Sequence, residues 1–175
     1  DLSPALVELS EEEAHHAVNV FRLAQGGVIG LLDGKGVFAE AEVIEVSKKK
    51  CTVRILQKES SGPERTARIH LAVAPTKQME RFEWFLEKAV EIGVDRITPL
   101  LTHRTERDKL RRDRMEKVLV GAMKQSQRRW LPQLDEMTKL KELMPSPHSL
   151  SQGEGHRSLQ KFFGWCEGEH VDLTS

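Results

Sequence analysis

The stretch RIHLAVAPTKQMERFEWFLEKAVEIGVDRITPLL, residues 68–101, decides the fold of this chain. It opens with a short apolar run that Pro75 ends, which predicts a buried strand. Gly93 stands where the following helix should end, and residues 95–101 predict a second strand. The helix itself is predicted over residues 77–94, because apolar residues recur there at intervals of three and four: Met79, Phe82, Leu86, Ala89 and Val90.

The sequence after residue 101 repeats this alternation. A second long helix is predicted over residues 108–129, and WLPQLDEM, residues 130–137, leads into a short helix at residues 138–144. Residues 159–167, LQKFFGWCE, predict a third strand. Strands that alternate with helices in this way favour an α/β fold with a mainly parallel sheet. Since nothing after residue 167 predicts a covering helix or a final strand, we expect the fold to be incomplete in this chain.

The first 60 residues follow a different pattern. Ser10 and Glu13 have the spacing of a capping box, which predicts a short helix over residues 11–21. Three stretches with strand signals follow, and the middle one alternates small apolar residues with glutamates. Residues 1–60 are therefore predicted to form a compact β-rich domain. A polar segment that contains Gly62 and Pro63, residues 61–67, is the predicted linker to the α/β domain at residues 68–175.

Charge is balanced overall but unevenly distributed. Lys and Arg together number 27, as do Asp and Glu, so the formal net charge is zero. Residues 1–20 hold five acids and no Lys or Arg, whereas residues 101–130 hold ten Lys or Arg against four acids. This asymmetry indicates an anionic partner for the second half of the chain.

Several classes of protein are not indicated. Cys51 and Cys166 match neither a disulfide framework nor a zinc site, and no metal is expected. The sequence lacks a P-loop, a G-x-G-x-x-G turn, an H-E-x-x-H helix and a C-x-x-C pair. The adjacent His15 and His16 are read as one partly buried residue and one exposed residue, not as metal ligands. Without a membrane-span or signal-peptide pattern, we expect a cytoplasmic protein.

The end of the second long helix is unusual. Its apolar stripe predicts that Ser126 and Arg129 lie on the buried side, where Leu or Val would be expected. A core helix rarely becomes polar and cationic unless those groups have partners. The alternative is that the helix ends at about Lys124 and that the remaining residues are exposed.

Further cations gather beside the predicted sheet. Arg104 follows the carboxyl end of the second strand, the edge where open α/β sheets bind ligands. The alternative, which is favoured for any single arginine, is a solvated loop whose arginines pair with Glu106 and Asp108. Glu91 is predicted to orient one of the nearby arginines. An exposed helix face carries three more: Arg111, Arg112 and Arg114.

Three stretches together resemble one known family. HAVNVFRL, residues 16–23, resembles an H-x-x-x-V-L-R motif, with Phe21 in place of the usual Leu. Residues 70–106 resemble a strand followed by Lys, Glu, K-x-x-E-L-G-V and I-x-P, with Ile92 in place of Leu. QSQRRWLP, residues 125–132, resembles Q-[SC]-x-R-x-x-x-P. In their order and spacing, these stretches are similar to the RsmE-type methyltransferases of the SPOUT superfamily.

The resemblance implies a PUA-like β-barrel over residues 1–60 and a trefoil-knotted SPOUT domain over residues 68–175. It also implies S-adenosylmethionine-dependent methylation of N3 of one uridine in 16S ribosomal RNA, by a cytoplasmic homodimer. The family's cofactor-binding G-P-E-G-G loop has no match here and is expected beyond Ser175. We therefore expect the chain as it stands to be inactive.

Carried over position by position, the resemblance places the family's polar signature on Arg22, Lys77, Glu80, Lys88, Glu91, Gly93, Arg104, Gln125 and Arg128. The exposed helix face adds Arg111, Arg112 and Arg114 to the candidate site residues. The expected catalytic residues are Arg104, Arg128 and Glu91. The motif therefore selects Arg128 where the helical periodicity selects Arg129, a conflict that disappears if the helix loosens in its last turn. The residues expected to bind RNA are Arg22, Lys77, Arg111, Arg112, Arg114 and Gln125.

Two other functions fit the same residues. One is a non-catalytic RNA-binding module, made of the barrel and a basic α/β platform, that needs no cofactor. The other is a structural adaptor whose basic patch binds an acidic protein. Binding of S-adenosylmethionine would separate the enzyme from the first alternative, and RNA affinity that falls steeply with salt would argue against the second.

Overall fold

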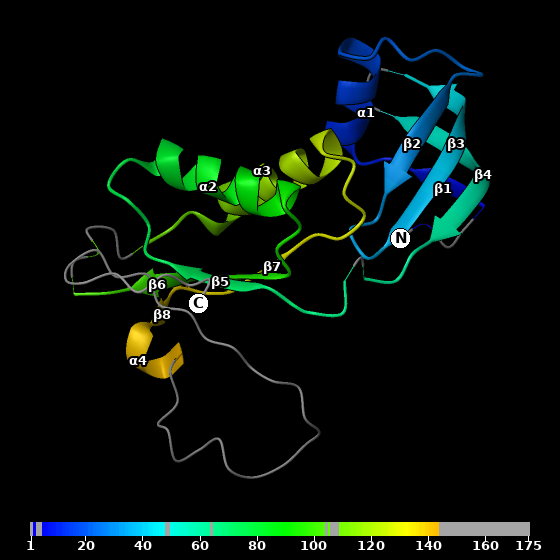
Figure 1. Cartoon of the computed structure of the whole chain (residues 1–175). Coiled ribbons are helices and arrows are strands. Elements are labelled where there is room, and N and C mark those ends of the chain that lie inside the picture. Colours follow the sequence, from blue (N-terminus) through cyan, green and yellow to red (C-terminus); the bar gives the residue numbers. More distant parts are fainter. Residues whose placement is uncertain are drawn as a thin grey trace. The chain divides into compact units, whose positions relative to one another are not determined.

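The computed structural model describes residues 2, 5–47, 50–63, 65–103, 105 and 109–143. These residues form an antiparallel sheet in the first half and a parallel sheet in the second (Figure 1). The predicted α/β class with a mainly parallel sheet is thereby confirmed. The expected third strand at residues 159–167 lies outside the described residues.

The antiparallel sheet has the strand order β1-β4-β3-β2 and is accompanied by helix α1. Ala41 and Val43 of β3 pack with Cys51 and Val53 of β4, and Ala14 of α1 completes this small core. Two register shifts along β3 bend the strand, as β-bulges do in barrel-like sheets. The elements are β1 (Leu6–Glu8), α1 (Glu11–Asn19), β2 (Val28–Leu32), β3 (Val37–Val46) and β4 (Cys51–Ser60).

The parallel sheet is built around β6, which pairs with β5 on one side and with both β7 and β8 on the other. Residues 130–137, which are predicted to lead into a short helix, also contain β7, a strand that the sequence pattern does not predict. The helix expected at residues 138–144 is reduced to α4. The elements are β5 (His70–Val73), α2 (Met79–Glu91), β6 (Arg96–Leu101), α3 (Arg112–Gln125), β7 (Gln133–Leu134), β8 (Thr138–Lys139) and α4 (Leu140–Leu143).

Helices α2 and α3 lie on the same face of the parallel sheet (Figure 1). Their apolar stripes meet in one core, in which Phe82 and Leu86 of α2 pack with Met115 and Leu119 of α3 and with Ile97 of β6. This is the apolar face that the spacing of α2 predicts. None of the described helices is long and apolar enough to cross a membrane.

The segment after α3 reaches the antiparallel sheet. The backbone N–H of Gly36 donates to the carbonyl of Arg129 over 2.9 Å, and the N–H of Leu131 donates to the carbonyl of Gly34 over 2.9 Å. Trp130 lies so close to Gly36 that an added Cβ would be 2.5 Å from the indole Cζ2. The hairpin loop between β2 and β3 therefore needs glycine at position 36, where φ is 100°.

We predict that Gly36→Ala lowers the free energy of unfolding by about 2 kcal/mol or more, because it combines a left-handed φ with contact against Trp130 and the Ser61 carbonyl. Gly121→Ala is the matched control, since nothing lies within 4 Å of an added Cβ in that exposed part of α3. It should raise the free energy of unfolding by about 0.5–1 kcal/mol. Urea unfolding followed by circular dichroism measures the free energy of unfolding of both variants. Equal effects of the two substitutions would contradict the requirement for glycine at position 36.

Candidate functional site

The carboxyl ends of β5 and β6 form the edge where a parallel sheet binds ligands. Beyond β5, Thr76, Lys77, Gln78 and Arg81 line a small hollow of 210 Å³. Beyond β6, a turn is closed by the N–H of Thr105, which donates to the Thr102 carbonyl over 3.1 Å. Arg104 lies outside the described residues.

A larger hollow of 330 Å³ opens between β6, β7 and the start of α3. Its apolar wall consists of Leu110, Met115, Leu134 and Met137. Charged groups at its border are Lys109, Arg112, Asp135 and Glu136. The lining of this hollow is therefore partly apolar and partly charged.

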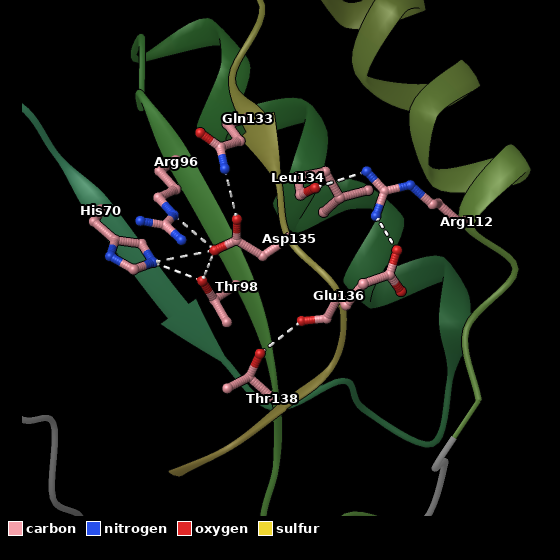
Figure 2. A network of polar contacts seen from close by, with 9 residues as sticks. All are labelled: His70, Arg96, Thr98, Arg112, Gln133, Leu134, Asp135, Glu136 and Thr138. Atoms are coloured by element: carbon pink, nitrogen blue, oxygen red, sulfur yellow. Dashed lines mark hydrogen bonds and ion pairs between the residues drawn. The ribbon is translucent and has the colours of Figure 1, made fainter. Parts of the chain in front are cut away.

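The three arginines expected on the exposed face of α3 are engaged in ion pairs. Arg111 contacts Asp113 at 3.1 Å, and Arg114 contacts Glu83 at 2.9 Å. Arg112 lies 2.7 Å from Glu116. It also donates to the carbonyl of Leu134 over 2.8 Å and pairs with Glu136 (Figure 2).

Hydrogen bonding to Glu116 raises the pKa of Arg112, and hydrogen bonding to Glu83 raises that of Arg114. Exposed ion pairs of this kind contribute little stability. A phosphate at these arginines would therefore have to replace a carboxylate.

Arg128 and Glu91 do come together, but not through the glutamate carboxylate. The Arg128 guanidinium donates to the backbone carbonyl of Glu91 through Nε at 3.0 Å and Nη2 at 2.6 Å. The Glu91 carboxylate instead accepts from Lys88 at 2.8 Å. Arg65 donates to the next two carbonyls, those of Ile92 and Gly93, so two guanidinium groups satisfy the end of α2.

The conflict between helical periodicity and motif is resolved by the end of α3. The helix stops at Gln125, and Gln127 adopts a left-handed φ of 54°. This turn directs Arg128 to α2. Arg129 reaches the antiparallel half, where it pairs with Glu59 at 2.7 Å and lies 5.5 Å above the ring of Phe38. The alternative prediction places the end of the helix near Lys124, and this part is confirmed. It also expects the following residues to be exposed, and this part is wrong, because Ser126, Arg128 and Arg129 are partly buried.

The remaining predicted residues are exposed and lie on different elements. Arg22 follows α1 in the antiparallel half, Lys77 precedes α2, and Gln125 ends α3. His15 and His16 are both exposed, so the expected partial burial of one of them is wrong. Among the described residues, no group of three or more His, Cys, Asp or Glu side chains could hold a metal ion.

Sequence reasoning missed a polar network on the parallel sheet (Figure 2). The hydroxyl of Thr98, a residue only 1% exposed, donates to the Asp135 carboxylate. Arg96 donates to the same carboxylate at 2.7 Å, and His70 Nε2 lies 2.7 Å from the Thr98 hydroxyl. Gln133 donates to the other oxygen of Asp135 at 2.9 Å. The available signal was the alternation of polar and apolar residues at Arg96-Ile97-Thr98 in β6 and at Gln133-Leu134-Asp135 in and after β7.

This network lies on the face of the sheet opposite α2 and α3. Ile97 and Leu134 pack with the helices, so their alternating neighbours Arg96, Thr98 and Asp135 point the other way. The network begins at the amino ends of the strands, away from the ligand-binding edge. Its main effect is to hold β7, which is two residues long, beside β6.

The environment of the network shifts two pKa values. Burial opposes the charge of Asp135, but hydrogen bonds from Arg96 and Thr98 outweigh it and hold its pKa below the ordinary value. Burial and the charge of Arg96 lower the pKa of His70, and Asp135 opposes this only in part. The folded protein therefore favours ionised Asp135 and neutral His70.

A histidine with a lowered pKa stabilises the fold fully above its unfolded-state pKa of about 6.5, and this contribution is lost as the pH falls through that value. We predict that wild-type stability falls between about pH 8 and about pH 5.5, and that His70→Gln, which cannot take up the proton, loses less over this range. Urea unfolding at both pH values measures the difference. Identical pH dependence of the two proteins would refute the assignment.

Comparisons with known proteins agree with this architecture. Residues 63–156 match the family described as "RNA methyltransferase domain", and residues 9–56 match "RNA methyltransferase PUA domain". The ribosomal RNA small subunit methyltransferase E of Bacillus subtilis is 26% identical over 142 residues, which cover 78% of this chain and 55% of that protein.

Solved structures give the same result. A "probable rRNA-methyltransferase" from Porphyromonas gingivalis is 36% identical, with a TM-score of 0.72 over 78% of this chain and 57% of that one. The ribosomal RNA small subunit methyltransferase E of Neisseria gonorrhoeae, bound to S-adenosyl methionine, is 28% identical, with a TM-score of 0.72 over 81% of this chain and 60% of that one.

The chain thus spans somewhat more than half the length of these relatives. The matched regions contain both sheets and the motifs that suggested the RsmE type, and that resemblance is confirmed. The chain belongs to the RNA methyltransferase family, and an RNA methyltransferase PUA domain precedes its methyltransferase region.

Proposed function

We propose that the full-length protein transfers a methyl group from S-adenosylmethionine to N3 of one uridine in 16S ribosomal RNA. The observation that carries this proposal is the joint match of both halves of the chain to RsmE-type relatives, one of which was solved with S-adenosyl methionine bound. The proposal includes a homodimer that acts in the cytoplasm, where its ribosomal substrate is made.

The chemistry requires stabilisation of negative charge on the base. Uridine N3 carries a proton, and as that proton leaves, charge develops on O2 and O4. Guanidinium groups that donate to these oxygens in a site with little water would stabilise the transition state. Transfer also requires the base to be held in line with the methyl group, so positioning residues contribute as much as donors do.

The described residues supply part of a cofactor site. The apolar wall of the 330 Å³ hollow, which includes Leu110, Leu134 and Met137, suits one face of an adenine ring. When bound, the cofactor supplies an electrophilic methyl group on a sulfonium.

The proposed roles differ for the three catalytic candidates. Arg104, at the carboxyl edge of β6, is proposed to contact the uridine oxygens. Arg128 is a positioning residue, because its guanidinium binds the Glu91 carbonyl and so aligns the ends of α2 and α3. Glu91 acts through that carbonyl and through its carboxylate contact with Lys88.

The proposed RNA contacts also fall into two groups. Arg22, Lys77 and Gln125 are exposed and extend the surface over both halves of the chain. The cations of the second group, Arg111, Arg112 and Arg114, would exchange their carboxylate partners for phosphates. Such an exchange costs little free energy, because exposed ion pairs contribute little to stability.

The function is tested with the full-length protein, tritiated S-adenosylmethionine and small ribosomal subunits from cells that lack the modification. We expect label in 16S ribosomal RNA, and mass spectrometry of the digested RNA should identify N3-methyluridine. Calorimetric titration of S-adenosylmethionine separates the enzyme from a non-catalytic RNA-binding module, which should produce no heat of binding. RNA binding without cofactor binding or methyl transfer would favour that module instead.

We predict that Arg104→Ala in the full-length protein lowers turnover about 100-fold or more, as expected when a donor to a developing oxyanion is removed. RNA affinity should fall by less than about tenfold, because the substitution removes one contact that contributes about as much to affinity as a single phosphate contact. Single-turnover kinetics and filter binding measure the two effects. Arg68→Ala, at an exposed position outside the proposed site, is the control, and equal losses of turnover and affinity would reduce Arg104 to a phosphate contact.

A further inference from the structure

Helix α1 has two chemically different ends. Its first turn is acidic, and two of these acids are bound by lysines of α3. Lys117 lies 3.0 Å from Glu12, and Lys124 pairs with Glu13. Hydrogen bonding to Lys117 lowers the pKa of Glu12, so this end of α1 is charged and already has partners. The other end, residues 16–23, contains no acid.

The carboxyl end of α1 is closed by its own backbone. The N–H of Val20 donates to the His16 carbonyl over 2.9 Å, and the N–H of Leu23 donates to the Ala17 carbonyl over 3.1 Å. This closure requires a left-handed residue at position 22, where glycine is normally favoured. Arg22 occupies it with a φ of 51°. This left-handed backbone conformation is better suited to glycine than to a residue with a long side chain. The presence of arginine here therefore points to a function for its side chain.

The residues beside Arg22 expose unusual apolar area. Val20 is 60% exposed and Phe21 is 65% exposed. The Phe21 ring is held by an edge contact with His16, whose ring centroid lies 5.2 Å away at an interplanar angle of 80°. A partly oriented aromatic ring with its other surface in solvent is a preformed stacking surface.

Arg22 supplies the charge that an apolar surface alone lacks. Its guanidinium has no hydrogen-bond or ion-pair partner within the part of the chain that the structure describes. A cation with no carboxylate to displace, directly beside an exposed aromatic ring, matches the chemistry of a nucleotide, whose base stacks while its phosphate is neutralised. An acidic protein surface would satisfy Arg22 but would leave Phe21 without a specific partner.

We infer that Phe21 and Arg22 form a contact for single-stranded RNA, in which the Phe21 ring stacks on a base and Arg22 binds an adjacent phosphate. This inference rests on the proposed function, which makes RNA the substrate, and it adds the kind of RNA that the first domain binds. Bases in an A-form duplex are already stacked, so a paired segment would offer Phe21 no face. The contact therefore favours an unpaired segment near the target.

The test uses the whole chain and a fluorescein-labelled single-stranded RNA of about twelve nucleotides, with the same sequence as a duplex for comparison. Fluorescence anisotropy should show that Phe21→Leu weakens single-strand binding at least about fivefold, while duplex binding changes less than twofold. Leu56→Ala is the matched control, since Leu56 is an apolar residue of β4 that is 54% exposed. It should leave both affinities as in the wild type.

Arg22→Gly provides a second, independent variant. It should weaken RNA binding and lower the slope of log affinity against log salt by about one. The same change should raise the midpoint of thermal unfolding, because glycine relieves the left-handed conformation. A purely structural role for Arg22 could not produce weaker RNA binding together with a more stable fold.

Unchanged single-strand affinity in both variants would overturn the inference. So would a change in self-association of Phe21→Leu, measured by sedimentation velocity, without a change in RNA affinity, because the patch would then bind a second copy of the chain. Methyl transfer is measured separately with the full-length protein. If transfer fails while RNA binding depends on Phe21, the inference holds and the proposed enzymatic function is wrong.

Discussion

The carbonyl groups at the end of α2 are the constraint on which the surrounding structure depends. A helix end leaves several carbonyls without partners, and here two arginines from distant parts of the sequence satisfy them. Arg65 comes from the segment before β5, and Arg128 comes from the turn after α3. Gly93 allows both guanidinium groups to approach, since an added Cβ would lie 2.7 Å from one of them.

The same contact determines the course of the chain after α3. Once Arg128 is bound to α2, Arg129 is directed to Glu59 and Phe38, and the next residues meet the loop at Gly34–Gly36. The polar residues at the end of α3 therefore first make contacts within the protein, and any contact with a ligand is additional to these. Beyond this segment the chain enters β7, which the Asp135 network holds beside β6.

The ion pairs of the arginines change the interpretation of the positive charge that the sequence concentrates in residues 101–130. Arginines on the face of α3 raise the local positive charge, but most of that charge is matched by carboxylates at hydrogen-bond distance. Net charge in a sequence window therefore overstates the electrostatic field available to an anionic partner. In the proposed function, side chains without such partners, among them Arg22, contribute more to RNA recognition, although they lie in a part of the sequence with few cations.

Local periodicity was sufficient to predict α2, α3, β5, β6 and the antiparallel strands β2, β3 and β4, but not β1, because burial of a regular apolar pattern selects one kind of element. Family-specific spacing identified the RNA methyltransferase family. The sequence could not reveal that β7 exists, since two residues carry no periodicity, or that Asp135, Thr98 and His70 meet, since they belong to three strands. It also could not tell which arginines are paired. Those outcomes depend on contacts between residues far apart in the chain, and only the tertiary structure brings such residues within hydrogen-bond distance.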